Sequence, residues 1–245
     1  MKAQQLYFIE PHQVEIREQQ LPPLQPDQVL VKNLYSAISA GTEMLVYRGQ
    51  LPVSMSLDEN LTASEAQTIN YPTQYGYACV GRVVEVGQGV GADWVGKAVF
   101  SFQPHASHYV CALDRIIPLP EGVDPKNAVF LANMETAVNL VQDGNPRLGE
   151  RVVVLGQGIV GLLVSSALAE FPLADLYAVE SIDGRRKLAV QAGVQATFSP
   201  EAESEISALQ EKLELNEVCG GADVVFELTG SPAALNLAVE LSAYS

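Results

Sequence analysis

The segment Val152-Val-Val-Leu-Gly-Gln-Gly-Ile-Val-Gly161 decides the fold of the second half of this chain. An aliphatic run precedes a Gly-x-Gly-x-x-Gly pattern, and an apolar helical pattern follows it directly. In that context Gly156 permits a tight turn, Gly158 lets the backbone approach a pyrophosphate, and Gly161 allows the helix to pack closely on the strand. The segment therefore predicts a strand, a phosphate-binding turn and a helix whose amino end faces the phosphates. A glycine-rich turn without a ligand is the alternative.

A carboxylate about twenty residues further on strengthens the dinucleotide interpretation. Residues 175–180 form a second apolar strand pattern that ends at Glu180, where the ribose diol of a dinucleotide needs an acceptor. The charge of Glu180 favours NAD over NADP, because it opposes a 2′-phosphate. Arg185 and Arg186 leave NADP open, since two guanidinium groups nearby could accommodate a phosphate. Solvated charge on a helix surface is the other interpretation of both arginines.

The chain changes its pattern near residue 125. Earlier residues read as short strands separated by proline and glycine, whereas strands and helices alternate from residue 151 onward. Such alternation is typical of a parallel sheet with helices on both faces. We therefore expect an α/β protein with a β-rich domain at 1–124 and a nucleotide-binding domain at 125–245, beginning with a connecting helix at 125–143. The polar segment 51–70 is interpreted as a surface loop, with a lid over a site as the alternative.

Composition and charge limit the partners. Of the 245 residues, 48% are hydrophobic, enough for buried cores, and 14 basic residues stand against 29 acidic ones for a formal charge of −15. This charge repels phosphate backbones and anionic lipids, so we expect neither nucleic acid nor membrane as a partner. The amino-terminal residues lack the apolar core of a signal peptide, which predicts a cytoplasmic protein. Cys79, Cys111 and Cys219 have no metal-binding or disulfide spacing and are expected to be buried or partly buried thiols.

A methyltransferase that uses S-adenosylmethionine is a rival from another class. Its sheet also combines a glycine-rich turn with an acid at the end of the second strand. The third glycine, Gly161, and the β-rich domain that precedes the nucleotide fold both favour the dinucleotide interpretation.

Beyond these patterns, the chain resembles the medium-chain dehydrogenase/reductase superfamily, the zinc-type alcohol dehydrogenases and their relatives, over nearly its whole length. The matching segments occur in the family's order: residues 36–43 (SAISAGTE), 74–87 (QYGYACVGRVVEVG), 98–100, 105–112 (HASHYVCA), 117–120 (IPLP), 136–137, 149–156 and 227–230 (ELTG). The resemblance implies a GroES-like catalytic domain followed by an incomplete Rossmann doubly wound parallel sheet, with the active site in the cleft between them. It also implies a small-molecule substrate and a homodimer when full length.

The same resemblance implies that both zinc sites of the family are lost. Zinc-dependent members read Gly-His-Glu where this chain reads Gly76-Tyr77-Ala78, so Tyr77 stands at the position of a zinc-binding histidine. The first zinc ligand, a cysteine in the family, falls on Ser39, and the cysteine-rich structural zinc lobe is absent between residues 99 and 109. We therefore predict no metal. This part of the sequence resembles the branch that contains bacteriochlorophyllide hydroxyethyl dehydrogenases.

Without zinc, another group must stabilise the negative charge that hydride transfer builds on the substrate oxygen. Tyr77 is the leading candidate, because a protonated phenol can donate a hydrogen bond to an oxyanion. Glu43 could relay a proton or orient Tyr77, and Ser39 and Thr42 could bind substrate or the nicotinamide ribose. Packing is the alternative role for Tyr77, acceptance of backbone N–H groups for Glu43, and turn stabilisation for the other two.

Two further histidines, His105 and His108, are expected to be structural or exposed rather than catalytic. For the cofactor, NAD or NADP with NAD preferred, we expect the following contacts: Gly156, Gly158, Ile159, Val160, Gly161, Glu180, Ser181, Arg185, Thr136 and Thr229.

Three functions are open at this point: a zinc-independent NAD(P)-dependent oxidoreductase, a nucleotide-binding protein of the same fold without catalysis, and the less favoured methyltransferase. The family continues with two more strands and a return segment, so we expect the carboxy-terminal part of the protein to lie beyond Ser245.

Overall fold

The computed structural model describes residues 1–51, 70–214 and 220–243. The chain divides into two compact units, residues 1–132 and 133–245. The segment interpreted above as a loop or lid, apart from its two ends, lies outside the described residues, as does Cys219.

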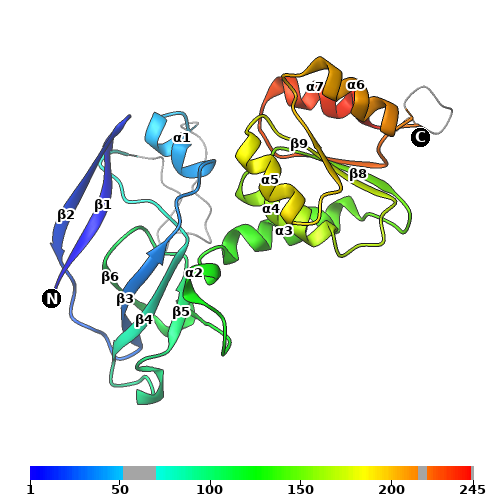
Figure 1. Ribbon diagram of the computed structural model, residues 1–245. Coiled ribbons are helices and arrows are strands. Elements are labelled where there is room, and N and C mark those ends of the chain that lie inside the picture. The colour runs from blue at the N-terminus through cyan, green and yellow to red at the C-terminus, as the bar shows by residue number, and fades with distance from the viewer. Residues whose placement is uncertain (52–69, 215–219, 244–245) are drawn as a thin grey trace. The chain divides into compact units, whose positions relative to one another are not determined.

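The first unit is built on antiparallel strands (Figure 1). One sheet has five strands in the order β6-β3-β4-β5-β7, and β1 and β2 form a separate hairpin. The strands are β1 (Lys2–Glu10), β2 (Gln13–Gln20), β3 (Gln28–Ser36), β4 (Cys79–Val86), β5 (Ala98–Ser101), β6 (His108–Ala112) and β7 (Ile117–Pro118). The helices are α1 (Thr42–Arg48) and α2 (Pro125–Ala128), with short 3-10 turns at Ala92–Trp94 and Leu113–Arg115.

Alternation along the strands sends side chains to two cores in this unit. Cys79 and Val83 of β4 pack in one core with Val29 and Val31 of β3. Val80, between them, packs in a second core with Phe100, Val129 and Ala132. Val129 and Ala132 are buried in this second core, so residues 125–132, which include α2, pack with the first unit. The sequence pattern placed these residues with the nucleotide-binding domain.

The second unit holds a parallel sheet in the order β10-β9-β8-β11. The parallel pairing matches the first four places of the doubly wound order 3-2-1-4-5-6, so the predicted Rossmann topology is confirmed for these strands. The strands are β8 (Arg151–Leu155), β9 (Asp175–Val179), β10 (Ala196–Phe198) and β11 (Val224–Glu227). The helices are α3 (Leu131–Gly144), α4 (Ile159–Leu168), α5 (Asp183–Gln191), α6 (Glu203–Lys212) and α7 (Pro232–Leu241).

Helices cover both faces of this sheet (Figure 1). Val152 and Val154 of β8 pack with residues of α3, α4 and α5, whereas Val153 and Leu155 pack with residues of α6 and α7. Both faces of β8 are therefore buried, which explains why the strand is a continuous apolar run rather than an alternating one. Open parallel sheets of this kind bind ligands at the carboxyl ends of their strands.

Two local expectations differ from the structure. The segment from residue 125 to 141, expected as one helix, forms α2 and α3, because the chain turns at Val129 and Phe130, where the Phe130 N–H donates to the Asn127 carbonyl. Helix α1 was not expected at all. At seven residues it is too short to show a helical period in the sequence.

The two described cysteines are free and buried, as expected. Burial raises the pKa of the Cys79 and Cys111 thiols to about 12 in each case, so neither is a thiolate at neutral pH. Across the part of the chain that the structure describes, no helix is long and apolar enough to cross a membrane.

The core under β8 can be tested at Leu168, which is fully buried in the cluster of α3, α4 and α5. Leu168→Ala should lower the free energy of unfolding by about 2 to 5 kcal/mol, because it leaves a cavity in a packed core. Leu148→Ala is the control, since Leu148 is 82% exposed and should change stability by less than about 0.5 kcal/mol. Urea denaturation measures both, and equal effects would show that this core is wrongly described.

Candidate functional site

The turn between β8 and α4 leaves no room for side chains at two of its glycines. Gly156 has φ +88°, and a Cβ there would lie 2.7 Å from Thr229 Cγ2. A Cβ on Gly161 would lie 1.9 Å from the Gly156 carbonyl oxygen, closer than atoms can approach. The first turn of α4 therefore packs directly on the end of β8, as the sequence predicts for these glycines.

Gly158, the middle glycine, is open. Apart from its chain neighbours, no described residue places an atom within 4 Å of the position that a Cβ would occupy. Gly158 is the N-cap of α4 and provides no side-chain cap, so the first N–H groups of the helix, at Ile159 and Val160, keep their capacity to bind an anion. The turn thus fits a phosphate group by shape and by polarity.

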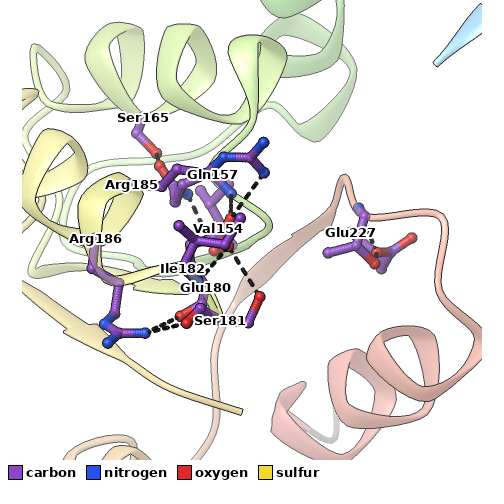
Figure 2. Close-up of polar contacts among 10 residues, drawn as sticks. Val154, Gln157, Ser165, Glu180, Ser181, Ile182, Arg185, Arg186 and Glu227 are labelled. Carbon is purple, nitrogen blue, oxygen red and sulfur yellow. Dashed lines mark hydrogen bonds and ion pairs between the residues drawn. The ribbon is translucent and has the colours of Figure 1, made fainter. Parts of the chain in front are cut away.

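Glu180 follows β9 and is buried, with 6% of its surface exposed. Its Oε1 accepts hydrogen bonds from the Ile182 N–H at 2.9 Å and the Ser181 hydroxyl at 3.3 Å (Figure 2). Its Oε2 accepts the Gln157 N–H at 2.7 Å. An ionised carboxylate has about four acceptor positions, so one position on Oε2 stays open for a ribose hydroxyl.

Gln157, the second residue of the glycine pattern, is fully buried although it is polar. Its side-chain oxygen accepts the Ser165 hydroxyl at 3.0 Å, and its amide nitrogen donates to the Val154 carbonyl at 3.4 Å. Figure 2 shows the Gln157 side chain directed toward α4, away from Glu180. The turn is therefore tied to both the strand before it and the helix after it. Sequence reasoning missed this residue, because the pattern places no demand on it.

The two arginines of α5 have different surroundings. Arg186 donates to the Glu180 and Ser181 carbonyls, both at 2.8 Å, and pairs with Asp183 at 3.5 Å, so its guanidinium is occupied (Figure 2). Arg186 is 19% exposed at its side chain, and its bonds hold the main chain at residues 180 and 181. Arg185 is half exposed and lies 3.9 Å from Glu180 Oε2, which leaves it free to move.

A cavity of about 590 Å³ opens at the carboxyl ends of these strands. Its described lining includes three glutamates, Glu180, Glu201 and Glu203, and no lysine or arginine. Apolar side chains of α6 and α7 also line it: Ile206, Ala233, Ala234 and Leu237. Four of the predicted cofactor residues line it: Gly156, Glu180, Ser181 and Thr229.

Thr229 is held by Glu227, the last residue of β11. One Glu227 oxygen accepts the Thr229 N–H at 2.7 Å and also the Thr229 hydroxyl, and the other accepts the Gly230 N–H at 3.3 Å. Figure 2 shows Glu227 on the strand whose loop faces the glycine turn. Thr136 lies exposed on α3. It is not among the described residues that line the cavity, and neither are the other five predicted cofactor residues, Gly158, Ile159, Val160, Gly161 and Arg185.

A second polar cluster lies in the first unit. Glu43 on α1 is 2% exposed, and its Oε2 lies 2.7 Å from His105 Nε2. The other ring nitrogen, Nδ1, lies 2.8 Å from the Ser36 hydroxyl. A Cβ on Gly76 would lie 3.0 Å from the His105 ring, so this pair packs directly against the residue before Tyr77. His105 is therefore buried and bonded rather than exposed.

The neighbouring predicted residues stabilise a turn. The Ser39 N–H donates to Glu43 Oε1 at 2.9 Å, and the Thr42 N–H donates to the Ser39 hydroxyl at 3.3 Å. These bonds match the structural alternatives for all three residues. Their catalytic roles stay predictions.

Tyr77 is partly buried and packs against two hydrophobic clusters, one that contains Phe100 and one that contains Phe8. Its ring centroid lies 6.2 Å from that of Tyr75 in an edge-to-face arrangement. The Tyr77 hydroxyl makes no hydrogen bond to a described residue.

The residues at the family's zinc positions do not fit zinc. The Ser39 hydroxyl accepts a backbone N–H, and Tyr77 offers a phenol rather than an imidazole. Within residues 1–51, 70–214 and 220–243, no three histidine, cysteine or acidic side chains are grouped to hold a metal ion. Loss of the zinc site stays a prediction.

Curated proteins similar to this chain are dehydrogenases. (R,R)-butanediol dehydrogenase of Bacillus subtilis is 26% identical over 256 residues, which cover 93% of this chain and 70% of that enzyme. L-threonine 3-dehydrogenase of Caldanaerobacter subterraneus is 27% identical over 257 residues, covering 92% and 69%. Sorbitol dehydrogenase 1 of Saccharomyces cerevisiae is 27% identical over 202 residues, covering 69% and 57%. No protein-family model matches the chain.

Solved structures share the fold. The Bacillus subtilis 2R,3R-butanediol dehydrogenase has a TM-score of 0.78 at 22% identity, with 98% of this chain and 74% of that chain covered. A zinc-binding dehydrogenase of Sinorhizobium meliloti bound to NADP has a TM-score of 0.80 at 20% identity, covering 99% and 74%. The glycine turn, the strand order and these relatives together show that the chain is similar to the zinc-type alcohol dehydrogenases of the medium-chain dehydrogenase/reductase superfamily and has the same GroES-like and partial Rossmann folds.

Proposed function

We propose that the protein is an NAD(P)-dependent oxidoreductase that acts on an alcohol, a carbonyl compound or an activated alkene without zinc. One observation carries the proposal: Gly156 of the glycine turn and the Glu180 carboxylate, which has a spare acceptor position, line one cavity, and the same turn has an open middle glycine and leads into an uncapped helix amino end. Phosphate fits the turn and the helix end, and ribose fits the carboxylate. The bound nicotinamide would supply or accept the hydride.

NAD(H) is the cofactor that the cavity favours. The three glutamates of its lining would repel a 2′-phosphate, and Arg186 is committed to two carbonyl groups. Arg185 is the remaining nearby cation, and its 3.9 Å contact with Glu180 would have to be broken to bind a phosphate. Members of the fold bind either cofactor, as the NADP complex above and an Escherichia coli alcohol dehydrogenase in complex with NADH illustrate.

In the first unit, Tyr77 is proposed as the hydrogen-bond donor to the oxygen that gains or loses charge. Its packed ring supports this role, because a donor held in place costs little reorganisation during the reaction. The pair of Glu43 and His105 is an acid–base group that packs against Gly76, the residue before Tyr77. We propose that it relays the proton that accompanies hydride transfer.

A nucleotide-binding protein without catalysis is the second candidate. It is favoured by the bonding of Glu43, Ser39 and Thr42, which accounts for all three residues without a substrate. Cofactor binding with no turnover of any alcohol would support this candidate.

The cofactor preference is tested by calorimetric titration of the chain with NADH and NADPH. NADH should bind about tenfold tighter or more, because the 2′-phosphate would approach the Glu180 carboxylate. Glu180→Ala should reduce this preference, whereas Glu170→Ala, an exposed acid outside the cavity lining, should not. Binding of neither nucleotide by the folded protein would remove the oxidoreductase proposal, and tighter binding of NADPH would assign the 2′-phosphate to Arg185.

The absence of zinc is tested by elemental analysis of the purified protein after dialysis against a chelator. We expect zinc far below one atom per chain, since hydroxyl and phenol groups hold Zn²⁺ poorly compared with thiolate and imidazole. One tightly held zinc per chain would contradict the metal-free mechanism.

The role of Tyr77 is tested with the substrates that name the relatives: 2,3-butanediol, L-threonine and sorbitol. For whichever is oxidised, Tyr77→Phe should lower kcat by about 100-fold to 1000-fold, the usual effect of losing one oxyanion donor. The melting temperature and NADH affinity should stay near wild type, because the ring that packs is retained. Tyr47→Phe removes a hydroxyl that only bonds the His12 carbonyl and should leave kcat unchanged. A normal kcat in Tyr77→Phe would show that the tyrosine only packs.

A further inference from the structure

The glycine pattern contains one residue whose burial its own motif does not explain. Gln157 is fully buried, and burial of an amide is costly unless its groups are bonded. Both of its side-chain groups are satisfied, one by the Ser165 hydroxyl and one by the Val154 carbonyl. A small apolar residue at this position would need no hydrogen-bond partners. The turn alone therefore does not require an amide here.

The main chain of the same residue reaches the ribose-binding acid. The Gln157 N–H donates to Glu180 Oε2 at 2.7 Å, and Oε2 is the carboxylate oxygen with a spare acceptor position. The side chain and the main chain of Gln157 therefore join Ser165 on α4 to the carboxylate after β9 (Figure 2). Any shift of the turn would move or release that oxygen.

We propose that Gln157 is a positioning residue for ribose recognition. Its buried bond to Ser165 fixes the turn, and the turn fixes Oε2 of Glu180 for a hydroxyl of the adenosine ribose. The inference rests on the proposed cofactor site. It adds that Gln157 sets the preference of this site for ribose over 2′-deoxyribose. Gln157 itself touches no ligand in this scheme, and it acts through Glu180.

The test compares adenosine diphosphate with its 2′-deoxy form by calorimetry on the full chain. Both probes carry the same base and phosphates, so the ratio of their dissociation constants isolates the ribose hydroxyl. Wild type should prefer the ribose form by about tenfold or more, as expected for a hydrogen bond to a charged acceptor. Gln157→Leu and Ser165→Ala should each reduce the ratio to about threefold or less while affecting the 2′-deoxy probe little.

A matched control lies next to the bond. Ser166→Ala removes a neighbouring hydroxyl of α4 that bonds only the Leu162 carbonyl of its own helix, and it should leave the ratio at the wild-type value. The double variant of Gln157→Leu and Ser165→Ala should resemble Gln157→Leu, because that change already removes the bond to Ser165 together with the bond to the Val154 carbonyl. If Gln157→Leu fails to fold, Ser165→Ala carries the comparison alone, since it removes one oxygen atom.

The outcomes separate the inference from the function it rests on. A wild-type preference that both variants retain overturns the role of Gln157 and leaves the cofactor proposal intact. A variant that weakens both probes equally shows general loosening of the turn and also overturns the inference. Wild type that binds the two probes equally shows that Glu180 does not read the ribose, and wild type that binds neither removes the cofactor proposal as well.

Discussion

The close contact between Gly161 and the Gly156 carbonyl is the constraint on which the second unit depends. Because a Cβ at position 161 would come within 1.9 Å of that oxygen, the first turn of α4 can sit on the end of β8 only with glycine there. This contact aims the amino end of α4 at the carboxyl edge of the sheet, where β9 delivers Glu180 and β11 delivers Thr229. A shift of α4 would displace its amino end relative to Glu180 and Thr229, so this short contact fixes where the phosphate-binding turn lies beside the cavity.

The first unit contains a different kind of interaction, a buried ionisable pair. Glu43 and His105 are almost inaccessible to water, and such a pair is costly to bury unless its remaining positions are bonded. They are bonded, to the Ser39 N–H and the Ser36 hydroxyl. Replacement by apolar residues would often be neutral for stability. The pair is therefore not required for folding as such, which is compatible with the proton relay proposed above.

The sequence is a good guide wherever a local pattern carries the information. The glycine pattern, the strand that ends at Glu180 and the parallel alternation could all be predicted, because turn geometry and period are written in adjacent residues. The pairing of Glu43 with His105 could not, since 62 residues separate them and only the tertiary fold brings them together. The use of Arg186 escaped prediction for a similar reason: the two carbonyls it binds carry no side-chain signal. Gln157 was invisible because the motif leaves its position unspecified.

The electrostatics of the cavity set a further condition on any anionic ligand. The chain has a formal charge of −15, and three glutamates line the cavity, so long-range steering opposes a dinucleotide. Attraction must come from short-range groups: the N–H groups at the start of α4 and the open backbone at Gly158. These groups act on the pyrophosphate within a few ångströms and are screened little by salt, whereas the repulsion from distant carboxylates is screened. Moderate salt should therefore weaken the repulsion from distant carboxylates more than the attraction by the N–H groups of α4. Proteins that attract phosphates with surface lysines behave in the opposite way, because salt weakens their binding.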